Sequence, residues 1–152
     1  MMTTRRTLVT SLGAVLAAPV WAAKPPAIPM EVWKDPNCGC CKDWGKHLEQ
    51  AGFAVRVYDT GNEAKRAALG MPQALGSCHT GVVGGFAIEG HVPAKDIQRL
   101  LREKPKALGL SVPGMPIGSP GMDGAIYKGR KDPFDVLLVA ANGNSTVFQS
   151  YR

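Results

Sequence analysis

The sequence of 152 residues predicts an α/β protein with a mixed β-sheet and flanking helices. Two observations lead to this prediction. Short segments in which apolar and polar residues alternate, as in half-buried strands, are interleaved with segments whose apolar residues recur at helical spacing. In addition, Gly84 and Gly85 separate two strand-like segments, and a pair of glycines in that position is a hairpin signal.

The first part of the pattern predicts a strand–helix–strand unit. Residues 30–34 alternate apolar and polar side chains and are expected to form the first strand. Residues 42–51 place apolar side chains on one helical face, and Gly52 is expected to end that helix. Residues 54–58 alternate again and predict a second strand, which such a unit places parallel to the first.

The second part of the pattern predicts a helix, a hairpin and a further helix. Residues 62–69 form the predicted helix, which Gly70 ends. Residues 80–83 and 86–89 are the two predicted hairpin strands. Residues 93–103 predict the third helix, because a proline stands at its start, where the missing N–H group is tolerated, and its apolar residues share one face.

The order strand, helix, strand, helix, strand, strand, helix is that of a thioredoxin-like domain. The segment 107–124 is dense in glycine and proline and fits no regular element. A loop of this length inside a compact domain is usually functional or disordered. Residues 135–140 and 146–151 then predict a C-terminal β-hairpin across an Asn-Gly turn. We therefore expect a thioredoxin-like sheet with a Gly/Pro-rich loop and a terminal hairpin.

The N-terminal segment predicts export. Arg5 and Arg6 precede an apolar run at 8–20, which is followed by Trp-Ala-Ala at 21–23, so residues 1–22 are expected to be a cleaved signal with a twin-arginine-like start. An uncleaved membrane anchor is the alternative, but the run is shorter than the roughly 20 residues that span a bilayer. The domain is then 23–152, located in the periplasm, with no stable membrane span expected.

The charge pattern bears on possible partners. The formal net charge is +6 at pH 7, and two of the arginines belong to the predicted signal. The remaining basic residues are scattered and form no long run with interleaved aromatic residues. Because nucleic-acid-binding proteins gather such residues in patches or stripes, we expect no nucleic-acid partner.

The four cysteines are the most informative residues. Cys38, Cys40 and Cys41 lie within four positions, between the first predicted strand and helix, and Cys78 precedes the third strand. In a thioredoxin-like sheet the entry to that strand lies beside the exit of the first, so the four sulfurs are expected to converge. Thiolates are soft ligands that favour Cu(I), zinc and iron–sulfur clusters. The pattern therefore predicts a metal site for which copper is the favoured ion.

Two alternatives to copper remain open. Zinc also accepts four thiolates in a closed tetrahedral site, although structural zinc sites usually pair two well-separated Cys-x-x-Cys units. Adjacent Cys40 and Cys41 suit bridged, multinuclear Cu(I)–thiolate clusters better. Structural disulfides are the second alternative, because an exported chain meets an oxidising compartment. A bridge of Cys38 to Cys40 or Cys41 would then accompany a link to Cys78.

Histidine and methionine side chains supply further candidate ligands. His79 follows Cys78 and either ligates the metal or orients a thiolate; a turn histidine facing solvent is the alternative. Met115 and Met122 lie in the Gly/Pro-rich loop and offer thioethers to Cu(I), or fill an apolar gap. His91 either reaches the site or serves in capping or packing, and His47 is expected to be a solvated helix residue.

Four ordered motifs resemble those of domain-of-unknown-function family 411, a family of small exported metal-binding proteins. The matching motifs are Asn37-Cys38-Gly39-Cys40-Cys41, Ser77-Cys78-His79-Thr80, Ile88-Glu89-Gly90-His91-Val92-Pro93-Ala94, and a loop motif that combines Val112-Pro113-Gly114-Met115-Pro116 with Gly118-Ser119-Pro120-Gly121-Met122. The resemblance covers nearly all of residues 23–152. It implies a thioredoxin-like fold, a periplasmic location and copper bound by the four cysteines.

These observations support two functions of different classes. The first is a copper-binding protein for copper resistance or homeostasis, which either sequesters Cu(I) or passes it to a periplasmic efflux or oxidase system. Thiolates near copper also allow Cu(I)/Cu(II) redox activity, so enzymatic activity is left open. The second is a thiol–disulfide oxidoreductase that uses the Cys38-x-x-Cys41 pair.

Overall fold

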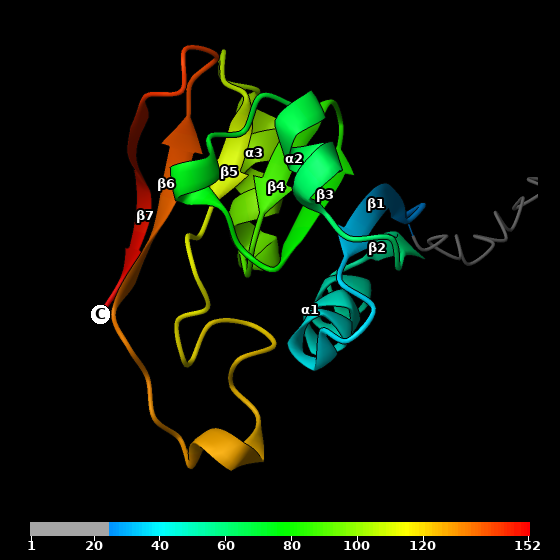
Figure 1. Cartoon of the computed structure of the whole chain (residues 1–152), viewed down its shortest axis with the longest axis vertical. Coiled ribbons are helices and arrows are strands. Elements are labelled where there is room, and N and C mark those ends of the chain that lie inside the picture. Colours follow the sequence, from blue (N-terminus) through cyan, green and yellow to red (C-terminus); the bar gives the residue numbers. More distant parts are fainter. Residues whose placement is uncertain (1–24) are drawn as a thin grey trace, which may run out of the picture.

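The computed structural model describes residues 25–152, so the predicted export signal at 1–22 lies outside the described residues. One seven-stranded mixed sheet runs through the domain, with the strand order β2-β1-β3-β4-β5-β6-β7 (Figure 1). In residues 25–152, the helices all fall short of the length and apolar character that crossing a bilayer requires. The prediction of a mixed α/β sheet with flanking helices is confirmed.

The elements follow the predicted order closely. They are β1 (Ile28–Lys34), α1 (Gly39–Gln50), β2 (Phe53–Tyr58), α2 (Glu63–Ala68), η1 (Gln73–Leu75), β3 (His79–Val83), β4 (Phe86–Glu89), α3 (Ala94–Glu103), β5 (Gly109–Ser111), η2 (Ala125–Tyr127), β6 (Phe134–Val139) and β7 (Ser145–Tyr151). Strands β1 and β2 are parallel and joined by α1, and β3 and β4 form the predicted antiparallel hairpin.

Strand β1 begins at Ile28, two residues before its predicted start at residue 30, and therefore includes Pro29. Proline cannot donate a ladder hydrogen bond and is confined to sheet edges and strand starts. At this position β1 pairs with β2 alone, since its pairing with β3 begins only at Glu31. The missing N–H group of Pro29 therefore falls where β1 has an open side.

The expectation that 107–124 forms no regular element is wrong for its first part. Residues 109–111 form β5, which pairs in parallel with β4 and antiparallel with β6, and so joins the C-terminal hairpin to the sheet. A Cβ atom on Gly109 would collide with the backbone of Ala87 on β4. The strand Gly-Leu-Ser is short and fully buried, so its residues show no alternation of apolar and polar side chains. Glycine is present at 109 because two backbones approach closely there, and not because the segment is a loop.

One face of the sheet carries the main core. Successive strand residues point to opposite faces, and Val32, Ile88 and Leu110 share the face that α1 and α3 cover. The fully or nearly buried members of this core are Met30, Val32, Trp44, Leu48, Phe53, Val83, Ile88, Val92, Ala94, Ile97, Leu100, Leu110, Val112 and Val136. The core thereby fixes α1, whose N-terminus holds three cysteines, against the sheet.

Helices α1 and α3 are also joined by polar contacts. The backbone N–H of Ala94 donates to Nε2 of His47 over 3.1 Å, and Gln98 donates to the carbonyl of Ala51 over 2.9 Å. His47 is thus half-buried and satisfies a free N–H group at the start of α3. The expectation of a solvated His47 is wrong, because helical periodicity within α1 does not reveal that a second helix end packs there.

Candidate metal centre

The cysteine loop follows directly from the end of β1. The carboxylate of Asp35 accepts the N–H of Asn37 over 2.8 Å, and its carbonyl accepts the N–H of Cys38 over 3.0 Å. This turn delivers Cys38 to the N-cap position of α1 in an extended conformation. Helix α1 begins at Gly39 rather than at residue 42, so Cys40 and Cys41 lie in its first turn.

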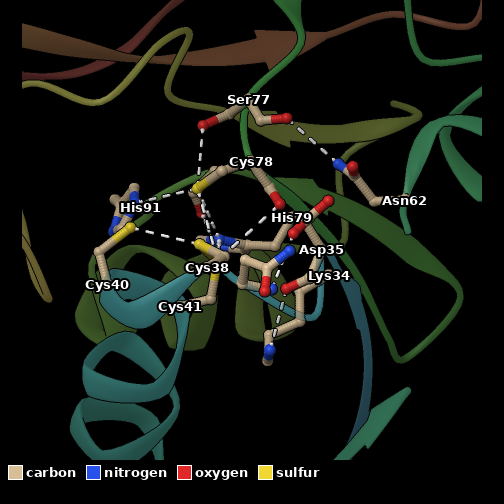
Figure 2. Close-up of a disulfide and its surroundings, with 12 residues drawn as sticks. Lys34, Asp35, Cys38, Cys40, Cys41, Asn62, Ser77, Cys78, His79 and His91 are labelled. Atoms are coloured by element: carbon tan, nitrogen blue, oxygen red, sulfur yellow. Dashed lines mark hydrogen bonds between the residues drawn. A yellow bond between two sulfur atoms is a disulfide. The ribbon is translucent and has the colours of Figure 1, made fainter. Parts of the chain in front are cut away.

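The four cysteines are in two chemical states. Cys38 and Cys41 are joined by a disulfide with an S–S distance of 2.06 Å, and Cys40 and Cys78 are free thiols (Figure 2). The link to Cys78 that a purely structural pair of disulfides would need is not formed. The site therefore holds two free thiols and one disulfide. Reduction of the disulfide would give two further thiols, four in all.

Cys78 reaches the cluster through the pairing of β1 with β3. Lys34 at the end of β1 is the partner of His79 at the start of β3, so the residue before β3 lies beside the cysteine loop. The Cys41 and Cys78 sulfurs are 3.6 Å apart, and those of Cys38 and Cys40 are 3.4 Å apart. All four sulfurs lie within 4.8 Å of one another, which confirms the predicted convergence.

His79 presents one ring nitrogen to this cluster. The Nε2–H group donates to the carbonyl of Gly90 over 2.9 Å, because a carbonyl can only accept. In the neutral ring this leaves the Nδ1 lone pair facing the sulfurs of Cys41 and Cys78, each 3.3 Å away. The ring is fully buried and lies against Trp44, with ring centroids 4.1 Å apart and the ring planes tilted by 33°. A turn histidine facing solvent is therefore excluded.

His91 is a second imidazole in the site. Its Nδ1–H group donates to the carbonyl of Pro120 over 2.8 Å, and its Nε2 lies 3.3 Å from the sulfur of Cys78. The sequence pattern left the role of His91 open, although the register of the predicted hairpin indicates its position. In the predicted hairpin Thr80 pairs with Glu89, so counting outward from that pair places residue 91 opposite residue 78.

The electrostatics of the site follow from burial. Burial holds the pKa of His91 below its ordinary value and that of His79 well below it, so both rings are neutral. Burial, together with the nearby Cys40 thiol, raises the pKa of the Cys78 thiol to about 12. Cys78 is therefore protonated near neutral pH, and a metal ion that binds it must displace the proton.

The Gly/Pro-rich loop covers the site from the side of α1. Ser77 donates its hydroxyl to the carbonyl of Gly114 over 2.5 Å, and Pro120 supplies the carbonyl that orients His91. Gly121 adopts a φ of +85°, and a Cβ atom there would lie 2.7 Å from the Cys40 carbonyl oxygen. Glycine is needed at this position because both the left-handed backbone and the close contact exclude a side chain.

We expect Gly121→Ala to loosen this loop. The substitution strains a left-handed backbone position and drives the new methyl group into the first turn of α1, and strain of this kind costs about 1–3 kcal/mol of unfolding free energy. Urea unfolding of the variant measures the loss. Gly124→Ala in the same loop is the control, since its φ is −64° and the methyl group would meet no atom within 4 Å. Equal stability of the two variants would contradict the close contact at Gly121.

The two loop methionines occupy different environments. Met115 is 51% exposed, next to the Gly114 carbonyl that Ser77 holds. Met122 is 8% exposed, and its sulfur accepts a hydrogen bond from the hydroxyl of Tyr127 over 3.4 Å. Neither contact joins a methionine sulfur to the cysteines, so their role as ligands stays a prediction.

The donor set fits a soft or borderline metal ion. Two groups of side chains place their donor atoms within 4.8 Å of one another: the four cysteines, and Cys78 with His79 and His91. Neither group contains a carboxylate, which excludes the oxygen-rich sites that Mg²⁺ and Ca²⁺ prefer. Sulfur and neutral imidazole are the ligands of copper and zinc. Each ring is oriented by a backbone carbonyl, as is usual for metal-binding histidines.

The fold and the site define a small α/β protein with a buried sulfur–imidazole donor cluster at the start of its first helix. Residues 75–122 match the family described as "Protein of unknown function, DUF411". Two solved structures, titled "Copper resistance protein copG", Form 1 and Form 2, are each 45% identical in sequence with a TM-score of 0.76. The alignments cover 82% of this chain and 98% of Form 1, and 83% and 99% for Form 2.

The chain therefore belongs to the DUF411 family, together with the copper resistance protein CopG. This membership confirms the family that the four sequence motifs predicted. Among curated proteins, none matches the sequence.

Proposed function

We propose that this protein is a periplasmic copper-binding protein for copper resistance, which holds Cu(I) through Cys38, Cys40, Cys41 and Cys78. The observation that supports the proposal most directly is the convergence of four sulfurs within 4.8 Å, beside two imidazole lone pairs. The relatives at 45% identity are titled copper resistance proteins, which favours copper over zinc as the ion.

The arrangement of the sulfurs favours a bridged copper cluster. Cys40 and Cys41 are adjacent in the first turn of α1, and adjacent cysteines serve a single tetrahedral ion poorly. In a cluster in which thiolates bridge two Cu(I) ions, adjacent cysteines do not have to bind the same ion. His79 and His91 add nitrogen donors next to the sulfur of Cys78. In this proposal Met115, which is exposed, receives the ion from solution, and Met122 is the last of the proposed ligands.

The Cys38–Cys41 disulfide links copper loading to redox chemistry. In the reduced protein the two thiols can give one electron each to two Cu(II) ions, which become Cu(I) while the sulfurs form the disulfide and release two protons. A dithiol reductant then has to give two electrons and two protons to the disulfide, becoming a disulfide itself, before four thiols are again available. Copper oxidoreductase activity is therefore part of the proposal.

The element order supports a thioredoxin-like assignment of the first part of the domain. A parallel β1-α1-β2 unit is followed by α2 and the antiparallel β3-β4 hairpin, and α3 packs beside α1. Strands β5 to β7 then extend this sheet. We further propose export through the segment 1–22 and transfer of copper to a periplasmic efflux or oxidase system.

An anaerobic Cu(I) titration of the reduced, exported protein tests the proposal. We expect tight binding of at least one Cu(I) ion per chain, with loss of this binding when all four cysteines are replaced by serine. Elemental analysis of protein exported in copper-supplemented cells identifies the ion that is bound in the cell. Undiminished Cu(I) affinity in the four-serine variant, or zinc in place of copper, would contradict the proposal.

A thiol–disulfide oxidoreductase is the second candidate, and the disulfide at the start of α1 favours it. Cys38 is half-buried and accessible at the N-cap, whereas Cys41 is 3% exposed, so an incoming thiolate would attack Cys38. Reduction of insulin by the metal-free, reduced protein distinguishes this function from copper binding. Cys40 and Cys78 count against it, because either thiol can divert the mixed disulfide.

A further inference from the structure

A buried polar network lies on the far side of the strand that carries His79. Glu89, which is fully buried, accepts hydrogen bonds from the Nε of Arg66 over 2.9 Å and from the hydroxyl of Thr80 over 2.6 Å. Asn62 donates to the same Thr80 hydroxyl over 3.1 Å. Arg66 and Asn62 are 5% and 6% exposed, so the network is shielded from solvent.

The same side chains hold the backbone of Ser77. Its N–H group donates to Glu89 over 2.7 Å, and its carbonyl accepts from Arg66 over 2.6 Å and from Asn62 over 3.2 Å (Figure 2 shows the Asn62 contact). Both the donor and the acceptor of one loop residue are therefore bound by buried groups. A rotation of the Ser77 backbone would break these contacts.

The position of these contacts connects them to the metal centre. Ser77 and Thr80 are the residues directly before and after the Cys78–His79 pair. Because successive strand residues face opposite sides of a sheet, Thr80 points to the α2 side while His79 points to the α1 side, where the sulfurs lie. The network thus holds Thr80 on the face opposite to His79, and it holds the backbone of Ser77, the residue directly before Cys78.

We propose that Arg66, Glu89 and Asn62 are positioning residues that hold Cys78 and His79 in the geometry required for metal binding; this inference rests on the copper site proposed above. The ion pair alone would be a weak stabilising device, because burying two charges carries a large desolvation penalty. The hydrogen bonds from Arg66 and Glu89 to Ser77 and Thr80 instead fix the position of the backbone around Cys78 and His79. Partners hydrogen-bonded directly to metal ligands typically contribute about 10–100-fold to metal affinity, and because this network acts through the neighbouring residues we expect an effect near the lower end of that range.

Thr80→Val is the mildest test of this role. Valine keeps the shape and the strand preference of threonine but removes the hydroxyl that Glu89 and Asn62 share. Competition with the Cu(I) chelator bathocuproine disulfonate measures the affinity, and the near-ultraviolet thiolate-to-copper absorption reports the ligand geometry. We expect a loss of affinity of about 10-fold or more together with a changed absorption band. Glu89→Gln, which keeps one acceptor for Ser77, is expected to act in the same direction.

Tyr151→Phe is the matched control. It removes the hydrogen bond of 2.5 Å from Tyr151 to Asp96, a residue 4% exposed on α3, and leaves the Ser77–Thr80 segment untouched. We expect thermal stability to fall in this variant with unchanged Cu(I) affinity. Measurements at a temperature at which all variants are folded by near-ultraviolet circular dichroism separate positioning from unfolding.

The outcomes distinguish this inference from the proposed function. Weaker Cu(I) binding and an altered band in Thr80→Val, with normal binding in Tyr151→Phe, would support the positioning role. Unchanged affinity in folded Thr80→Val and Glu89→Gln, or an equal loss in Tyr151→Phe, would overturn it while the copper site stands. Failure of the unmodified protein to bind Cu(I) would instead refute the proposed function, and this inference with it.

Discussion

Cys78→Ser is expected to lower the Cu(I) affinity of the reduced protein by more than about 100-fold, since outer partners of ligands alone contribute 10–100-fold. Cys78 is the one cysteine that belongs to both donor groups: the four sulfurs, and the trio with His79 and His91. Its loss removes a donor from each group, and serine supplies a hard oxygen that Cu(I) accepts poorly. Chelator competition measures the affinity, and the titration endpoint gives the number of ions bound.

Cys40→Ser is the control for this prediction. Cys40 is also a free thiol, but it belongs to the four-sulfur group alone and lies 3.4 Å from Cys38. We expect a smaller loss of affinity, because Cys78 keeps both imidazoles as neighbours. If the two variants lose affinity equally, the imidazoles add nothing to binding at Cys78, and the sulfurs act as a single set.

Trp44→Ala is expected to reduce the free energy of unfolding by about 3–5 kcal/mol, the usual cost of deleting a buried aromatic side chain. Trp44 is fully buried, its ring lies against His79, and its Nε1–H donates to the carbonyl of Val92 over 2.9 Å. The loss is large against the 5–15 kcal/mol that stabilises most domains. Urea unfolding of the metal-free protein, followed by circular dichroism, measures it.

Trp33→Ala tests whether this effect is specific to the buried position. Trp33 is only partly buried and stacks on Tyr58, with ring centroids 4.8 Å apart, while the ammonium of Lys65 lies 3.9 Å from its ring centre. We expect its removal to cost about 0.5–1.5 kcal/mol beyond the lost area of contact. A loss at Trp33 as large as that at Trp44 would show that total aromatic contact, and not the support of His79, determines the stability.

The local elements were accessible from the sequence because their patterns are local. Alternation predicted β1 and β2, helical spacing predicted α1 and α3, and Gly84-Gly85 marked the β3–β4 hairpin. Strand β5 was not accessible, because three buried residues carry no period and Gly109 is explained only by the backbone of β4. The start of α1 at Gly39 was missed for a similar reason, since its first turn contributes no apolar face apart from Cys41.

The sequence by itself determined the chemistry of this protein: four thiols, three of them in one short segment, with a histidine beside the fourth. The composition of a donor set is a property of residue types and needs no fold. Only the tertiary structure decided which groups meet. The β1–β3 pairing brings Cys78 to Cys41, the β3–β4 register adds His91, and Gly90 and Pro120 set the two imidazole tautomers. These contacts join residues far apart in the chain, and their distances depend on strand register and packing, which no local pattern encodes.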